Sequence, residues 1–222
     1  MKPTPLTIAA IATVVITYIR AIFFTPLEAL QGPAQKILYV HAPAAWVAFM
    51  AFFLVAIASG LYLWLREDRL DRIAESSAEV GVVFTTVVLV TGPLWGKPVW
   101  GAYWTWDARL TLTLFLWFIY VAYMVLRGAI DDYSMRARYS AVLGILGALL
   151  IPFIHLSVYL FRTLHPQPIL MKPSAPSLPR EMLTTLLIAF ASFTLLYVAL
   201  LRARYRYAVE RDSANPEERH DA

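Results

Sequence analysis

The stretch APAAWVAFMAFFLVAIASGLYLWL, residues 42–65, contains no charged side chain. An α-helix needs about 20 mostly apolar residues to cross the hydrocarbon core of a bilayer, so this stretch is long enough for one membrane span. Apolar residues make up 59% of the 222-residue chain and charged residues only 15%. A soluble globule of this size buries far less apolar side chain. The sequence therefore predicts an all-α integral membrane protein.

Five further stretches have the length and apolar character of a span. The six predicted spans are residues 5–24, 42–65, 77–95, 108–127, 138–161 and 182–201. Little chain is left for a soluble domain, so we predict one six-helix membrane domain, residues 1–210, and a polar tail, residues 211–222. Only Lys2 precedes the first stretch as a charged residue, and no small-residue cleavage site follows it, so we expect this stretch to persist as a span.

Six spans place both termini on one side of the membrane. The loops 25–41, 96–107 and 162–181 then share the opposite side. Of the 19 Lys and Arg residues, twelve fall on the terminal side and seven on the other. Because positive charge is enriched in cytoplasmic loops, we expect both termini to be cytoplasmic. This bias also accounts for the formal net charge of +4, and no nucleic-acid partner is needed to explain it.

The loop between the third and fourth predicted spans contains a cluster of aromatic residues. Trp95, Trp100, Trp104 and Trp106 are four of the seven tryptophans, and they fall within the sequence WGKPVWGAYWTW, residues 95–106. Tryptophan is common at membrane–water interfaces, so simple anchoring is one interpretation. The two glycines and the proline favour a non-helical segment on the outer face, whose flat rings form a shelf for a large planar ligand.

Two of the four histidines fall at span boundaries on the same side as this segment. His41 is followed by Pro43, which suits the first turn of a helix, so we expect the imidazole at the mouth of the second span. His165 precedes Pro166, which favours an extended backbone where the fifth span ends. Since the three loops on this side lie together whatever the orientation, we expect both histidines to lie near the tryptophans.

The remaining residues restrict metal chemistry further. The chain has no cysteine, which excludes thiolate ligands and disulfides. His155 lies within the fifth span, and an ionisable group inside a membrane is a functional candidate by default. A continuous helix would place His155 roughly 15 Å from position 165, too far for both residues to act together, so a structural hydrogen bond is the favoured interpretation for His155. His220 lies in the polar tail.

Paired imidazoles beside a group of indoles suit haem, because the iron takes axial nitrogen ligands and the porphyrin packs on aromatic rings. The haem propionates require cations at the wet edge. Asp107 fits the N-cap of the fourth span, with pairing to Arg109 or support of the Trp-rich segment as a second role. Sequence does not choose among the candidate propionate partners, which are Lys36, Lys97, Arg109, Arg162 and Arg20.

The longest segment on this side, residues 165–179, contains five prolines and cannot form a continuous helix. We expect an extended strap. Glu181 then lies at the start of the last span, where a helix N-terminus favours negative charge.

These motifs resemble the CcmC, or haem exporter protein C, family of cytochrome c maturation proteins, which belongs to the haem-handling proteins named after a tryptophan-rich WWD motif. The resemblance covers nearly the whole chain. It rests on WGKPVWGAYWTWDARLT (95–111), LYVHAPAA (38–45), IHLSV (154–158) and TLH (163–165) in the expected order. It implies that haem b is held at the outer face between two axial histidines, which map onto His41 and His165, over the tryptophan platform. Tyr103 stands where close relatives often have another Trp.

The resemblance also implies partners and a location. Haem would pass to the membrane-anchored haem chaperone CcmE, assisted by CcmD and the ATP-driven CcmA–CcmB complex, at the outer face of the bacterial inner membrane. The implied role is binding and transfer without turnover, although assistance in covalent attachment of haem to the chaperone stays open. Two alternatives also stay open. One is an electron-transfer cytochrome with two histidine ligands, and the other is a haem-conducting transporter subunit.

Overall fold

The computed structural model describes residues 3–170, 174–175 and 177–214. Six of its helical segments are long and apolar enough to cross a membrane, when α5 and α6 are taken as one segment. The described residues form no β-sheet. The predicted all-α fold with six spans is confirmed. The helices are α1 (Pro5–Ile19) with a π-helical continuation (Arg20–Phe24), a 3₁₀-helix (Pro33–Ile37) leading into α2 (Leu38–Leu65), α3 (Asp68–Trp100), α4 (Ala108–Ala129), α5 (Tyr133–Ala148), α6 (Leu150–Leu160) and α7 (Arg180–Ala214).

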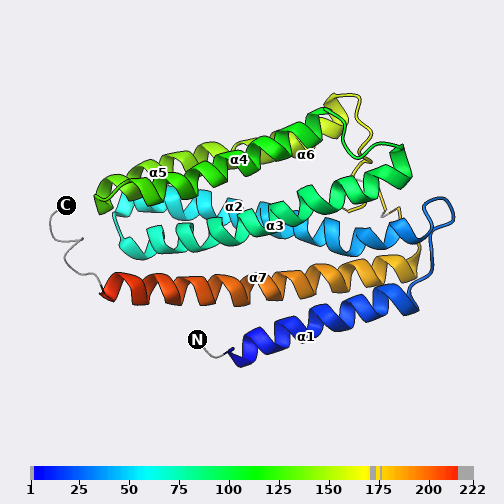
Figure 1. Cartoon of the computed structure of the whole chain (residues 1–222), viewed down its shortest axis with the longest axis horizontal. Helices are drawn as coiled ribbons and strands as arrows, with labels where there is room; N and C mark the ends of the chain where they lie inside the picture. The colour runs from blue at the N-terminus through cyan, green and yellow to red at the C-terminus, as the bar shows by residue number, and fades with distance from the viewer. Residues whose placement is uncertain (1–2, 171–173, 176, 215–222) are drawn as a thin grey trace.

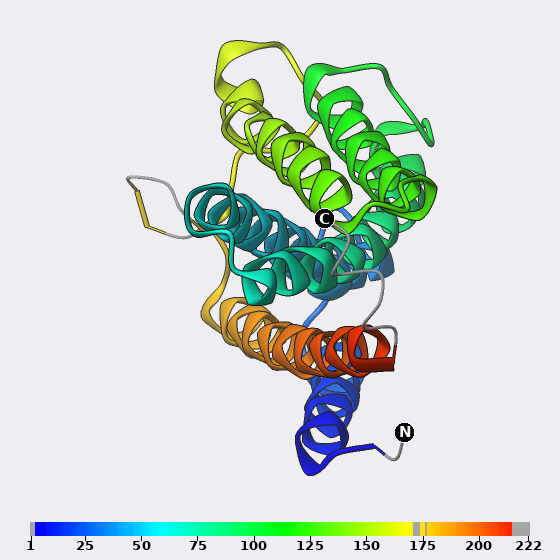
Figure 2. The same ribbon diagram turned by 90° about the vertical axis from the view of Figure 1, so that its left-hand side faces the viewer.

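The helices run roughly side by side along one long axis (Figure 1). The start of α1 and the end of α7 lie at one end of the bundle, which we call the terminal end, together with the α2–α3 and α4–α5 connections. The other three connections lie at the opposite end, called the loop end. Viewed along the axis, α4, α5 and α6 cover one side of the α2–α3 pair, α7 covers the other, and α1 packs on α7 at the edge (Figure 2).

The core between α2, α4 and α5 is closely packed. The rings of Phe52 and Tyr120 stack with centroids 3.7 Å apart and planes inclined by 12°. The Tyr120 hydroxyl donates to the Gly144 carbonyl oxygen at 2.8 Å. A Cβ at Gly144 would approach Val55 to 2.8 Å, so glycine at this position lets α5 lie against α2. Small residues at helix contacts are the usual way in which membrane helices approach closely.

A buried charge network joins α3, α4 and α7 at the terminal end. Arg127 donates to both carboxylate oxygens of Asp71, at 2.6 and 2.8 Å, and lies 3.3 Å from Glu75. Arg211 donates to both oxygens of Glu75 at 2.7 and 2.9 Å. Helix α3 carries both of these carboxylates, because it begins at Asp68, ahead of the predicted start of the third span at 77.

Helix α7 is also longer than the predicted sixth span, residues 182–201. It continues beyond 201 through Ala214, so residues 211–214 of the predicted polar tail are helical. Residues 215–222, including His220, lie outside the described residues. Glu181 occupies the first turn of α7 as expected.

The prediction that Pro43 opens the second span is wrong. The 3₁₀-helix starting at Pro33 runs directly into α2 at Leu38, so Pro43 is in the interior of α2 and His41 lies one turn inside the helix. A proline is accommodated at a helix start because its missing N–H has no intrahelical partner there, and Pro33 fills that position.

The prediction of a non-helical segment from Trp95 onward is also wrong in part. Helix α3 continues through Pro93 and Pro98 to Trp100. It ends at Gly101, whose φ of 79° is the left-handed conformation that glycine adopts readily at helix ends. Only residues 101–107 are irregular before Asp107 caps α4. Trp95 and Trp100 therefore project from a helix, and only Trp104 and Trp106 lie in the loop.

The fifth predicted span is divided at Leu149 into α5 and α6. Beyond α6, residues 161–170 contain no helix or strand, in agreement with the expected strap. Residues 171–173 and 176 of that segment lie outside the described residues.

Candidate functional site

His41 is fixed against α3 by a specific contact. Its Nδ1 atom lies 3.0 Å from the Thr91 hydroxyl oxygen, and the Thr91 hydroxyl donates to the Val87 carbonyl oxygen at 2.7 Å. A Cβ at Gly92 would lie 3.3 Å from the His41 Cε1 atom, so glycine leaves room for the imidazole. Thr91 and Gly92 were not predicted from the sequence. A hydroxyl and a glycine side by side in an apolar span were the only signal.

His165 lies in the loop after α6 and is held by its neighbours in sequence. Its backbone N–H donates to the Thr163 hydroxyl at 3.1 Å, and its Nδ1–H donates to the Pro166 carbonyl oxygen at 2.9 Å. Burial, and then the nearby Arg109 guanidinium, lower the pKa of His165 from 6.5 to about 3. The imidazole is therefore neutral near pH 7, which is the form that binds a metal.

The loop end brings the two imidazoles together, as the sequence predicts. The ring centroids of His41 and His165 are 6.4 Å apart, with planes inclined by 35°. An imidazole nitrogen binds a transition metal at about 2.0 Å, so two rings on opposite sides of one ion have centroids roughly 6 Å apart. In both rings Nδ1 has a hydrogen-bond partner, which leaves Nε2 available as a ligand.

Two tryptophans of α3 border this pair. The Trp95 ring meets His41 edge-on, with centroids 5.9 Å apart, and its N–H donates to Gln31 Oε1 at 2.9 Å. The Trp100 ring lies 6.4 Å from His165 at an angle of 60°. A Cβ at Gly96 would lie 3.0 Å from the Trp100 ring, so this glycine lets the indole fold back over its own helix. Trp95 and Trp100 therefore line the site through tilted rings.

The other two tryptophans of the motif pair with each other. Trp104 and Trp106 form an edge-to-face contact with centroids 5.6 Å apart. Trp106 is 77% exposed, whereas the Trp104 N–H is buried and has no hydrogen-bond partner among the described residues. Tyr103 is exposed, and the Lys97 ammonium lies 5.4 Å from its ring centroid. The predicted platform therefore consists of a helical pair and a loop pair.

Asp107 and Arg109 connect this motif to α4. Asp107 accepts from the Leu110 N–H at 3.0 Å, which confirms the predicted N-cap. The Arg109 Nη1 atom is buried without a hydrogen-bond partner in the described part of the chain, and so is the Thr111 hydroxyl. Buried donors without partners are costly, and the Arg109 guanidinium lies close enough to His165 to lower its pKa, so this donor favours an acceptor such as a carboxylate near the histidines.

The remaining candidate cations divide by environment. Lys36 donates to the carbonyl oxygens of Ala21, at 2.7 Å, and Thr25, so it caps the helical turn after α1. Arg20 donates to the Thr185 hydroxyl at 3.1 Å. Lys97 donates to the Gly101 carbonyl oxygen at 3.0 Å from an exposed position, and Arg162 is exposed. Arg109 is thus the candidate with a buried and unpaired donor beside the histidines.

His155 does not join the pair. It lies half-buried on α6, where its ring contacts Tyr159 with centroids 6.3 Å apart. Within the described ranges, no group of three or more His, Asp or Glu side chains could hold a metal ion by itself. The two imidazoles at the loop end could supply only two ligands, so they fit a metal that brings its own equatorial ligands, as iron in a porphyrin does.

The fold is that of a multi-pass helical membrane protein in which two imidazoles and two tryptophans meet at one end of the bundle. A family profile described as "Heme exporter protein C" matches residues 2–219, and the chain belongs to this family. Family membership implies a role in haem handling for cytochrome c biogenesis.

Three relatives illustrate the similarity, and all carry the description Heme exporter protein C. The protein of Bradyrhizobium diazoefficiens is 41% identical over 187 residues, which cover 84% of this chain and 71% of that protein. The Haemophilus influenzae protein is 37% identical over 193 residues, 86% of this chain and 78% of the relative. The Escherichia coli K12 protein is 37% identical over 160 residues, 72% of this chain and 65% of the relative.

Proposed function

We propose that the chain binds haem b at the loop end with His41 and His165 as the axial ligands, and delivers it to the haem chaperone CcmE. Trp95 and Trp100 border the ligand, and Arg109 pairs with a propionate. Haem is the cargo of this site. The observation that carries the proposal is the 6.4 Å separation of two imidazoles whose Nδ1 atoms are both hydrogen-bonded.

The two ligands differ in how firmly they are held, and this difference supports transfer. His41 lies on a transmembrane helix and is hydrogen-bonded to a second one. His165 lies on an irregular segment, and in the part of the chain that the structure describes its hydrogen bonds reach only residues within two positions. Irregular segments with few long-range contacts open at lower free-energy cost than helices. We infer that His41 stays in place and that His165 releases haem, whereas a permanent electron-transfer cytochrome favours two fixed ligands.

Membership of this family supports the proposed partners and location. The chain would act with CcmE, CcmD and the CcmA–CcmB complex in the bacterial inner membrane, with the loop end on the periplasmic side. The excess of Lys and Arg on the terminal side supports this orientation. Trp106, which is 77% exposed at the loop end, provides an apolar surface that CcmE can contact.

The test is the visible absorption spectrum of the detergent-purified protein, oxidised and reduced, in four forms. These are the wild type and the His41→Ala, His165→Ala and His155→Ala variants. We expect a six-coordinate b-type spectrum in the wild type and in His155→Ala, the matched control for loss of an imidazole. Both other variants should lose haem or become five-coordinate. A wild type that stays colourless with added haem would refute the proposal.

Transfer needs a separate readout. The haem-loaded protein is mixed with purified haem-free CcmE, the two are separated, and haem is measured on each. We expect haem to move to the chaperone. Retention of all haem on the membrane protein, with CcmE shown to accept haem from solution, would favour the electron-transfer alternative.

A further inference from the structure

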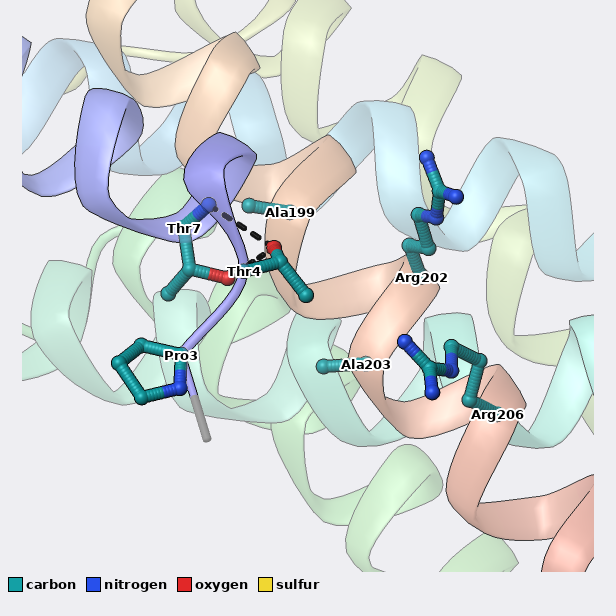
Figure 3. A pocket seen from close by; sticks show the side chains of 7 residues that line it. All are labelled: Pro3, Thr4, Thr7, Ala199, Arg202, Ala203 and Arg206. Carbon is teal, nitrogen blue, oxygen red and sulfur yellow. Dashed lines mark hydrogen bonds between the residues drawn. The ribbon is translucent and has the colours of Figure 1, made fainter. Parts of the chain in front are cut away.

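A pocket of about 180 Å³ lies at the terminal end, between the first turn of α1 and the last part of α7 (Figure 3). It lies at the opposite end of the bundle from the histidine pair. Ala199 and Ala203 point from α7 toward the start of α1, where Pro3, the N-cap residue Thr4 and Thr7 line the same pocket, and the two small side chains leave the space open. Two arginines one helical turn apart, Arg202 and Arg206, complete its lining.

The arginines of α7 fall into two groups. Arg204 pairs with Glu79 and Arg211 with Glu75, so these two face carboxylates of α3. Arg202 and Arg206 are exposed and form no ion pair within the described residues. Two guanidinium groups lie beside one pocket whose lining, among the residues that the structure describes, contains no carboxylate, and this favours an anionic ligand.

The chemistry of the lining indicates a phosphate group. Guanidinium groups bind phosphate oxygens through paired, charge-assisted hydrogen bonds. Thr4 and Thr7 add hydroxyls that hydrogen-bond each other at 2.9 Å and line the same pocket. The partial positive charge at the start of α1 acts in the same direction.

The position of the pocket favours a lipid as the source of the phosphate. The apolar stretch of α7 ends at Leu201, so Arg202 and Arg206 lie where a membrane span meets the headgroup layer. Helix α1 packs mainly on α7 and lies at the edge of the bundle (Figure 2). Its exposed Ile8, Ile11 and Val15 provide an apolar surface for acyl chains.

We propose that this pocket binds the phosphate of an anionic phospholipid headgroup, such as phosphatidylglycerol, and thereby attaches α1 to α7. The proposal does not depend on the haem site. Each Arg near an anionic headgroup strengthens binding by about fivefold, so the two together contribute about 20- to 30-fold.

The experiment is native mass spectrometry of the full chain in detergent with added lipid. Wild type is compared with Arg202→Gln/Arg206→Gln and with the control Arg69→Gln/Arg138→Gln, which removes two exposed arginines from the same end outside the pocket. Each form is titrated with phosphatidylglycerol, with phosphatidylcholine and with inorganic phosphate. The fold of each is checked by monodisperse elution and helical circular dichroism.

We expect the wild type and the control to bind phosphatidylglycerol at least tenfold more tightly than phosphatidylcholine, and the pocket variant to lose this preference. Equal binding of phosphatidylglycerol by the pocket variant and the control would overturn the site. Inorganic phosphate that binds the wild type and displaces the lipid at equal concentration would overturn the lipid as the source. If the pocket variant elutes as an aggregate, single Arg202→Gln and Arg206→Gln variants are measured with the same criteria.

Discussion

The Nδ1 atom of His41 on α2 lies 3.0 Å from the Thr91 hydroxyl oxygen on α3, and that hydroxyl lies 2.7 Å from the Val87 carbonyl oxygen. A hydroxyl has one proton to donate. Because the carbonyl oxygen can only accept, the Thr91 proton goes to Val87 and Thr91 accepts from the His41 Nδ1–H. This fixes the tautomer of His41 and leaves Nε2 as the ligand atom.

Replacing Thr91 by Val removes the acceptor and keeps the shape of the side chain. We expect the haem affinity to fall about 10- to 100-fold, because a hydrogen-bond partner of a ligating histidine contributes that much. The measurement is haem binding by titration, together with the electron paramagnetic resonance spectrum of the ferric protein, which reports the orientation of the axial imidazole.

The control for this prediction is Thr91→Ser, which retains a hydroxyl at the same place. We expect it to restore most of the affinity and the wild-type resonance spectrum. If Val and Ser behave alike, the hydroxyl does not orient His41.

Replacing Gly92 by Ala tests how much space surrounds the His41 ring. The added Cβ atom would lie 3.3 Å from His41 Cε1, and the imidazole would have to move by a few tenths of an ångström. We expect Gly92→Ala to weaken haem binding about tenfold, although Ala favours the helix by about 1 kcal/mol relative to Gly. Gly60→Ala is the matched control, since nothing lies within 4 Å of its added Cβ. Equal haem binding in both variants would show that the site tolerates the displacement.

The buried Arg109 donor predicts a contact with a haem propionate. Arg109→Gln should weaken haem binding by about 2 kcal/mol, roughly 30-fold, because a hydrogen bond to a charged group contributes that much. Haem dimethyl ester has no carboxylate, so it should bind the wild type and this variant equally. The measurement is a titration of both proteins with both porphyrins.

Lys97→Gln is the control for the loss of positive charge at the loop end. An exposed ion pair contributes at most about 1 kcal/mol, so we expect less than a fivefold effect. A larger loss in Lys97→Gln than in Arg109→Gln would assign the propionate to the exposed lysine.

The charge network at the terminal end predicts a stability effect without a change at the haem site. Arg127→Leu leaves Asp71 buried and unpaired, which should lower the free energy of unfolding by about 3–5 kcal/mol. The double variant Asp71→Asn/Arg127→Leu should recover part of this loss, because no charge is left alone. The free energy of unfolding of the single and the double variant is measured by denaturation in detergent. A single-variant loss below 1 kcal/mol would show that water reaches the network.

The sequence predicted the parts of the fold that depend on local chemistry. The apolar runs located six spans, and their number placed His41 and His165 at the same end as the tryptophans. The N-cap at Asp107 was also predicted, because a carboxylate directly before an apolar run satisfies the free N–H groups of a helix start.

Features that depend on contacts between helices were not predictable from the sequence. Asp71 and Glu75 on α3 pair with Arg127 on α4 and Arg211 on α7, and nothing in the spacing of these four residues along the chain indicates the pairing. Thr91 gains its role only when α3 lies beside α2 in one particular register. Residues that lie on one helix turn can be paired from spacing alone, whereas residues on different helices cannot.

We propose above all that one iron is bound by two imidazoles at the loop end. The most direct measurement is near-infrared magnetic circular dichroism of the ferric, haem-loaded protein, because the position of its charge-transfer band identifies the axial ligand pair. We predict the band of a low-spin haem with two histidine ligands. A band characteristic of histidine with methionine or water, in protein whose haem is fully bound, would contradict the account.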